Sequence, residues 1–86
     1  MLKQNSQNML LDILTPEKQL FKGEIKSVKL PGTDGEFEIF NNHAPIISTL
    51  KKGEIRVIDS SSKKEIFSIN GGVIEMQNNK IIVLAD

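Results

Sequence analysis

The sequence has no cysteine, no tryptophan and no tyrosine, and it has a single histidine. The absence of cysteine excludes disulfides and a thiolate metal cage, and a lone histidine leaves histidine-based metal sites without a second ligand. Eleven basic and eleven acidic side chains cancel. This balance argues against a nucleic-acid-binding module, because such modules usually carry a basic excess. We therefore expect no metal, no cofactor and no nucleic-acid partner.

Long apolar runs are also missing, and the chain of 86 residues has room for one domain. Nothing approaches the roughly 20 apolar residues of a membrane span. The polar start, Met1–Asn8, and the run Met9–Leu14, which is interrupted by Asp12, make a poor signal peptide. We expect a flexible tail at 1–8 and a single domain at 9–86, with membrane association only through a partner. Because so small a core has a thin stability margin, docking into a larger assembly is a reasonable expectation.

Turn-forming residues recur at short, regular intervals, and runs of about five to eight residues rich in Ile, Val, Leu and Phe lie between them. No window of ten or more residues shows the apolar spacing of a helix. The pattern predicts an all-β protein, an antiparallel sandwich or barrel. The turn signals are Thr15–Lys18, Pro31–Gly35, Asn41–Asn42, Lys51–Gly53, Asp59–Lys63, Asn70–Gly72 and Gln77–Lys80.

Individual runs refine this prediction. Apolar and acidic residues alternate in Glu36–Ile39, as expected for a strand with one wet face. The parity of Glu24–Leu30 slips, which a bulge near Lys26–Ser27 would restore. Asn78–Asn79 suits a type I′ hairpin turn. Ile81–Leu84 is apolar on both sides, which fits a strand that is buried between layers or covered by a partner.

Residues able to carry chemistry are few. His43 could serve as a general base only with a positioned nucleophile and an orienting acid, so we favour a turn histidine that is bonded to nearby backbone. Glu36 and Glu38 share a strand face roughly 7 Å apart, a spacing that could serve a glycosidase. A solvated face is the simpler interpretation, and a surface that recognises a basic partner lies between these two. The sequence predicts no catalytic residue.

Four glycines are interpreted as structural. Gly32 and Gly35 flank a turn that lacks the Gly-Lys-Ser/Thr ending of a phosphate-binding loop. Gly71 and Gly72 are a turn signal, and they are interpreted as a place where strands cross closely rather than as a ligand loop.

The order in which several short motifs follow one another along the chain says more about function than the spacing of single residues does. From about residue 9 to the end, the sequence resembles the epsilon subunit of the bacterial rotary ATP synthase, the equivalent of mitochondrial delta. The motifs that carry the resemblance, in order, are Leu30–Phe37, Asn42–Ile47, Leu50–Ile55, Gly71–Glu75 and Val83–Asp86.

The resemblance implies a β-sandwich of about ten strands at the foot of the central stalk, on the cytoplasmic face of the bacterial inner membrane. It implies a non-catalytic rotor subunit that binds gamma on one side and the c-ring on the other. Glu36 matches the family's acidic contact to the c-ring loops. His43, Ala44 and Pro45 match its His-Ala-Pro loop, and Gly71 and Gly72 match its double glycine.

The sequence departs from the family pattern in three places. Glu38 stands where the family usually has glycine, and Asn41–Asn42 stands where it has Pro-Gly. Family members commonly continue into a helical hairpin that is implicated in inhibition and, in some members, in ATP binding. The sequence ends at Asp86, so we expect no carboxy-terminal helical hairpin and no nucleotide site.

A second hypothesis is a free-standing sandwich that binds a carbohydrate or a peptide through the face of Glu36 and Glu38. Sugar-binding faces usually present exposed Trp or Tyr for stacking, and the sequence has neither. This absence favours the rotor subunit.

Overall fold

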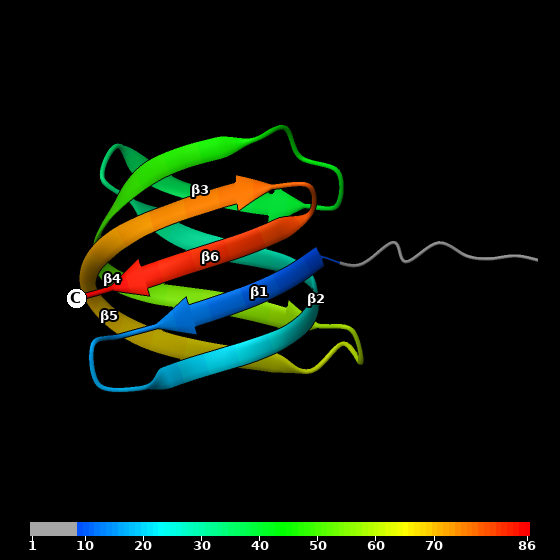
Figure 1. Cartoon of the computed structure of the whole chain (residues 1–86), viewed down its shortest axis with the longest axis horizontal. Coiled ribbons are helices and arrows are strands. Elements are labelled where there is room, and N and C mark those ends of the chain that lie inside the picture. Colours follow the sequence, from blue (N-terminus) through cyan, green and yellow to red (C-terminus); the bar gives the residue numbers. More distant parts are fainter. Residues whose placement is uncertain (1–8) are drawn as a thin grey trace, which may run out of the picture.

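The computed structural model describes residues 9–86, which form an all-β sandwich (Figure 1). The fold class is as predicted, but in place of about ten strands the described residues form six. Three of the six are 14 residues long and each takes the place of two short ones. Among the described residues, no helix could span a membrane. The expected tail at 1–8 lies outside the described residues. The strands are β1 (Met9–Leu14), β2 (Gln19–Gly32), β3 (Gly35–Phe40), β4 (Ile46–Asp59), β5 (Lys64–Gln77) and β6 (Lys80–Ala85).

The strands form one sheet that closes on itself. Their order is β1-β6-β5-β4-β2-β3, and an additional pairing joins β1 to β2. All pairings are antiparallel except that of β1 with β6, which is parallel. The first part of β2 pairs with β1, and its second part pairs with β3 and β4. The long strand β2 therefore belongs to both layers. Figure 1 shows the long strands β2, β4 and β5 curving from one layer into the other.

The core lies between the two layers and is built by alternation along the strands. Inward positions are apolar and nearly all fully buried, whereas outward positions are mostly polar. Phe21 and Phe67 pack at the margin of the core with their rings edge to face, 5.8 Å between centroids. The buried hydrophobic side chains are Met9, Leu11, Ile13, Ile25, Val28, Leu30, Ile39, Leu50, Ile55, Val57, Ile69, Ile74, Met76, Ile81, Val83 and Ala85.

Two local predictions are confirmed. The register of β2 against β4 shifts between Ile25 and Ser27, so the bulge lies where the parity slipped. The shift lets Ile25 and Val28 both face the core. Asn78 and Asn79 form the turn between β5 and β6 with φ of 54° and 60°, as a type I′ turn requires.

Two predicted turns are replaced by continuous strand. Lys51–Gly53 lies within β4, and Gly71–Gly72 lies within β5. The glycines serve close approach instead. A Cβ on Gly53 would lie 2.8 Å from the Cβ of Pro31, and a Cβ on Gly72 would collide with the carbonyl oxygen of Leu84. The interpretation of Gly71 and Gly72 as a place where strands cross closely agrees with this packing.

Candidate functional site

The acidic candidates lie on the outer face of β3. Glu36 and Glu38 are exposed, while Ile39 is buried and Phe37 packs against the core, so the strand has the predicted wet and dry faces. The Lys29 ammonium lies 3.9 Å from a Glu36 carboxylate oxygen, and both side chains are about half exposed. An exposed pair at this distance contributes little to stability. Glu36 is therefore a largely solvated charge that a partner can reach.

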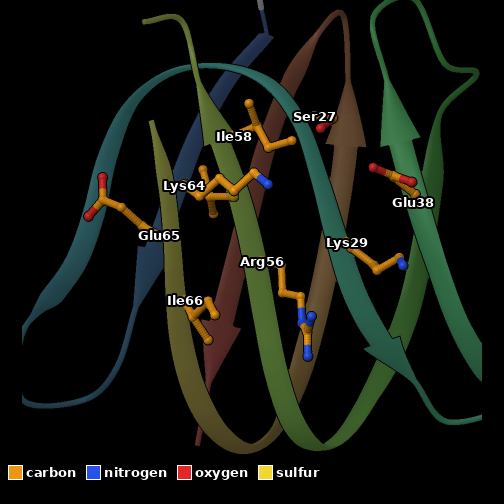
Figure 2. Close-up of a pocket in the computed structure, with 9 residues that line it drawn as sticks. Ser27, Lys29, Glu38, Arg56, Ile58, Lys64, Glu65 and Ile66 are labelled. Atoms are coloured by element: carbon orange, nitrogen blue, oxygen red, sulfur yellow. The ribbon is translucent and has the colours of Figure 1, made fainter. Parts of the chain in front are cut away.

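The same outer face carries an open groove that runs over β2, β4 and β5, shown in Figure 2. Lys29, Arg56 and Lys64 contribute cations to it, and Ile58 and Ile66 contribute apolar surface. The Arg56 guanidinium donates a hydrogen bond of 3.1 Å to Glu54 on its own strand. The single histidine lies elsewhere, and no cluster of metal-ligating side chains occurs among residues 9–86. The groove suits polar recognition and offers no arrangement of nucleophile and base.

The loop between β3 and β4 carries His43, Ala44 and Pro45, all exposed. The Nδ1 atom of His43 lies 2.7 Å from the carbonyl oxygen of Ala44. Because that oxygen can only accept, Nδ1 carries the proton. The interpretation of His43 as a turn histidine bonded to nearby backbone is confirmed. Pro45 forms one side of an open hollow that continues over the ends of β4 and β5.

The predicted site residues do not converge. Glu36 lies at the start of β3, beside the turn that Gly32 and Gly35 flank, whereas the His43–Pro45 loop follows the other end of that strand. Gly32 is held to glycine by packing, because a Cβ there would lie 2.6 Å from the carbonyl oxygen of Gly35. The acidic residue and the loop are thus two separate surfaces at opposite ends of one strand (Figure 1).

A third surface was not among the predicted site residues. Leu14, Leu84 and Val73 are cross-strand neighbours on the outer face of β1, β6 and β5. Leu84 is 51% exposed and Val73 43% exposed, and Ile47 on the adjoining strand β4 is 81% exposed. An antiparallel sheet normally turns polar residues to water. We call Leu14, Ile47, Val73, Ile82 and Leu84 the apolar outer face.

The signal for this surface was the segment Ile81–Leu84. Because it is apolar on both sides, it left two possibilities, burial between layers or cover by a partner. Ile81 and Val83 point into the core, and Leu84 points outward with no layer of the described residues above it. The structure therefore favours cover by a partner.

Comparison with known proteins identifies the family. A family model described as "ATP synthase, Delta/Epsilon chain, beta-sandwich domain" matches residues 8–86. The chain belongs to the ATP synthase delta/epsilon family. The resemblance stated from the motifs is confirmed, and so is the sandwich fold. A member of this family is a non-catalytic subunit of the synthase. This agrees with the sequence analysis, which predicts no catalytic residue.

Two relatives illustrate the range of lengths. The ATP synthase epsilon chain of Chlorobium limicola is 45% identical over 76 residues, which cover 88% of this chain and 86% of that one. The ATP synthase epsilon chain of Campylobacter concisus (strain 13826) is 42% identical over 76 residues, which cover 88% of this chain and 59% of that one.

Solved structures share the fold at low sequence identity. A chain in the cryo-EM structure of the Euglena gracilis mitochondrial ATP synthase matches with a TM-score of 0.87 and 14% identity, covering 96% of this chain and 53% of that one. A chain of the Tetrahymena thermophila mitochondrial ATP synthase, from its central stalk and c-ring structure, matches with a TM-score of 0.76 and 19% identity, covering 95% and 66%. At these identities the matches show the fold alone.

Proposed function

We propose that the chain is a rotor subunit of the central stalk, which couples rotation of the c-ring through gamma to ATP synthesis in the catalytic head of a proton-translocating ATP synthase. Family membership and two outer faces of different character support this role. One face is mostly apolar, and the other combines charges, Glu36 among them, with exposed apolar side chains such as Ile66. Because these faces belong to opposite layers, a body held on both sides can pass torque between partners without chemistry of its own.

The apolar outer face is the proposed contact for gamma, and it is the single observation that carries the proposal. Leu14, Leu84 and Val73 form a cross-strand row, and Ile47 lies in the neighbouring row, opposite Glu75. Fully burying a Leu or Val side chain stabilises by about 1.5–3 kcal/mol, so covering the exposed half of each would contribute about 1 kcal/mol per residue. Such a contiguous apolar surface is typical of a protein interface.

Glu36 is the proposed contact for the polar loops of the c-ring. Its solvated carboxylate can pair with a basic or hydrogen-bonding loop, which favours correct register more than raw affinity. His43, Ala44 and Pro45 would form a stiff loop at the far end of β3, toward both partners. Bacterial relatives support a site of action on the cytoplasmic face of the inner membrane, where the chain is held peripherally through the complex.

Co-elution with purified gamma tests the apolar face. We expect Leu84→Lys to weaken the complex strongly, because the ammonium would be buried against apolar surface. Ile66→Lys is the matched control, since Ile66 is 57% exposed but lies on the opposite outer face. Equal binding by the two variants, or no binding by the wild-type chain at moderate salt, would contradict the proposal.

Assembly onto the c-ring tests Glu36. Glu36→Lys should reduce assembly and leave the thermal unfolding midpoint nearly unchanged, because the ion pair it removes is exposed and long. Glu38→Lys is the control, two residues along the same strand face. The c-ring contact would be refuted if Glu36→Lys assembled as well as Glu38→Lys.

A further inference from the structure

One polar cluster joins segments that lie far apart in the sequence. The side chain of Asn79, in the turn between β5 and β6, contacts the loop that follows β3. Its Nδ2 group donates to the Oδ1 atom of Asn41 at 2.8 Å and to the Oδ1 atom of Asn42 at 3.3 Å. Its own Oδ1 atom accepts the backbone N–H of Asn42 at 2.9 Å. We call this group of three residues the asparagine clamp.

The amide orientation of Asn79 follows from its partners. A backbone N–H can only donate, so the atom that faces the Asn42 nitrogen must be the oxygen. The amide nitrogen then faces two side-chain oxygens, which accept both of its protons. The backbone carbonyl oxygen of Asn79 also accepts a hydrogen bond of 2.9 Å from the backbone N–H of Leu10, which ties the same turn to β1. The turn is thus fixed from two directions.

The clamp acts on the conformation of the loop. Asn42 has φ of 66°, in the left-handed region that costs free energy for any residue with a side chain. The bond from its N–H to Asn79 holds the residue there, and the N–H of His43 bonds to the Phe40 carbonyl at 3.3 Å. Directly after these bonds come His43, Ala44 and Pro45, which are exposed.

The loop borders a surface already assigned to docking. Pro45 and Ile47 line one open hollow together with Glu75 and Gln77 on β5. Ile47 belongs to the apolar outer face, so the loop forms the rim of that face. A rim that is fixed before binding loses less conformational entropy when the partner covers it.

We propose that Asn79 is a positioning residue of the docking surface, which holds the His43–Pro45 loop in its binding conformation through the asparagine clamp. This proposal rests on the proposed function, because it takes gamma as the partner that covers the rim.

Asn79→Gly tests the proposal. Glycine keeps the positive φ of 60° and removes all three side-chain bonds. Asn78→Gly is the matched control, since Asn78 has φ of 54° in the same turn and none of the side-chain bonds found within residues 9–86 involves it. In Asn79→Gly, amide hydrogen exchange at Asn42 should become at least tenfold faster, and the affinity for purified gamma should fall roughly five- to thirtyfold. Asn78→Gly should change neither.

A third variant separates the hydrogen bond that the Asn79 side chain accepts from the two that it donates. Asn79→Asp keeps an acceptor for the Asn42 N–H but loses the donors to Asn41 and Asn42, so exchange at Asn42 should stay close to the wild-type rate. If Asn79→Gly speeds exchange but binds gamma as tightly as Asn78→Gly, the clamp only shapes the free loop and the positioning role is overturned. If exchange at Asn42 were unchanged in Asn79→Gly, the clamp itself would be overturned. No binding by the wild-type chain would instead refute the proposed function, and the docking role with it.

Discussion

Substituting Gly72 by alanine should destabilise the protein severely. Gly72 lies in the middle of β5 with φ of 154°, where side chains are rarely accommodated. A Cβ there would lie 3.0 Å from the Cα of Ala85 and would collide with the carbonyl oxygen of Leu84. Both atoms are backbone of β6, so no side chain can rotate away, and β5 and β6 must separate locally.

The magnitude follows from these two effects. The unfavourable φ costs about 1–2 kcal/mol. Separating the strands at the Gly72–Ala85 pair also costs about 2 kcal/mol if it breaks a ladder hydrogen bond on either side, at about 1 kcal/mol each. The sum, about 3–4 kcal/mol, is a large part of the roughly 5–15 kcal/mol that stabilises a typical domain. At about 4–8 °C per kcal/mol for a domain of this size, the unfolding midpoint should fall by about 12–30 °C.

The assay is thermal and urea unfolding of the full chain, followed by far-UV circular dichroism. Gly23→Ala is the matched control, because Gly23 also lies in a strand, its φ is outside the left-handed region, and the nearest atoms to a new Cβ are ring carbons of Phe21 at 3.6 and 3.7 Å. Its midpoint should change by only a few degrees. If Gly72→Ala melted within a few degrees of Gly23→Ala, the close approach of β5 and β6 would not hold this position to glycine.

Three further predictions concern stability, and each is measured by urea unfolding. Asp59→Ala should cost about 1–2 kcal/mol, because its carboxylate accepts the backbone N–H groups two and four residues further on, at 2.9 Å each, in the turn between β4 and β5. The neighbouring exposed Ser60→Ala should be nearly neutral, and equal effects would show that the carboxylate does not stabilise this turn. Ile74→Ala should cost about 2–5 kcal/mol through the cavity it leaves, against less than about 1 kcal/mol for the exposed Ile66→Ala, and a similar loss in both would mean that the core is misassigned. Phe67→Leu should lower the free energy of unfolding by about 0.5–1.5 kcal/mol more than the lost buried area accounts for, because it removes an edge-to-face contact with Phe21. A neutral result would show that this contact does not contribute to stability.

The sequence predicts features whose cause is local. The alternation in β3 predicts which side is wet, because successive side chains point to opposite faces whatever the neighbouring strands do. The parity slip near Lys26–Ser27 predicts a bulge for the same reason. Asn78–Asn79 predicts its hairpin because asparagine tolerates positive φ at low cost.

Features whose cause is tertiary are not predicted. Gly53 has the sequence signature of a turn, but its role is to let Pro31 pack against the strand. Gly71 and Gly72 likewise permit a close crossing inside β5, so the expected short strands are parts of long ones. The apolar outer face was signalled only by Ile81–Leu84, because alternation tells which side faces outward and not whether a partner covers it. The asparagine clamp joins Asn79 to Asn42 and Asn41, which lie 37 and 38 positions earlier in the sequence, so no local pattern could indicate it.

The long strands also bear on how the sandwich could carry force between two partners. In a sandwich of separate sheets, the layers are joined mainly by side-chain packing, which can slide. Here β2 pairs with β1 in one layer and with β3 and β4 in the other, so the backbone itself crosses between layers. Shear between the apolar outer face and the face of Glu36 must therefore strain covalent chain and ladder hydrogen bonds. In the proposed role of passing torque between two partners, this topology would add stiffness, and the close approach of β6 to Gly72 would keep the two strands tightly paired.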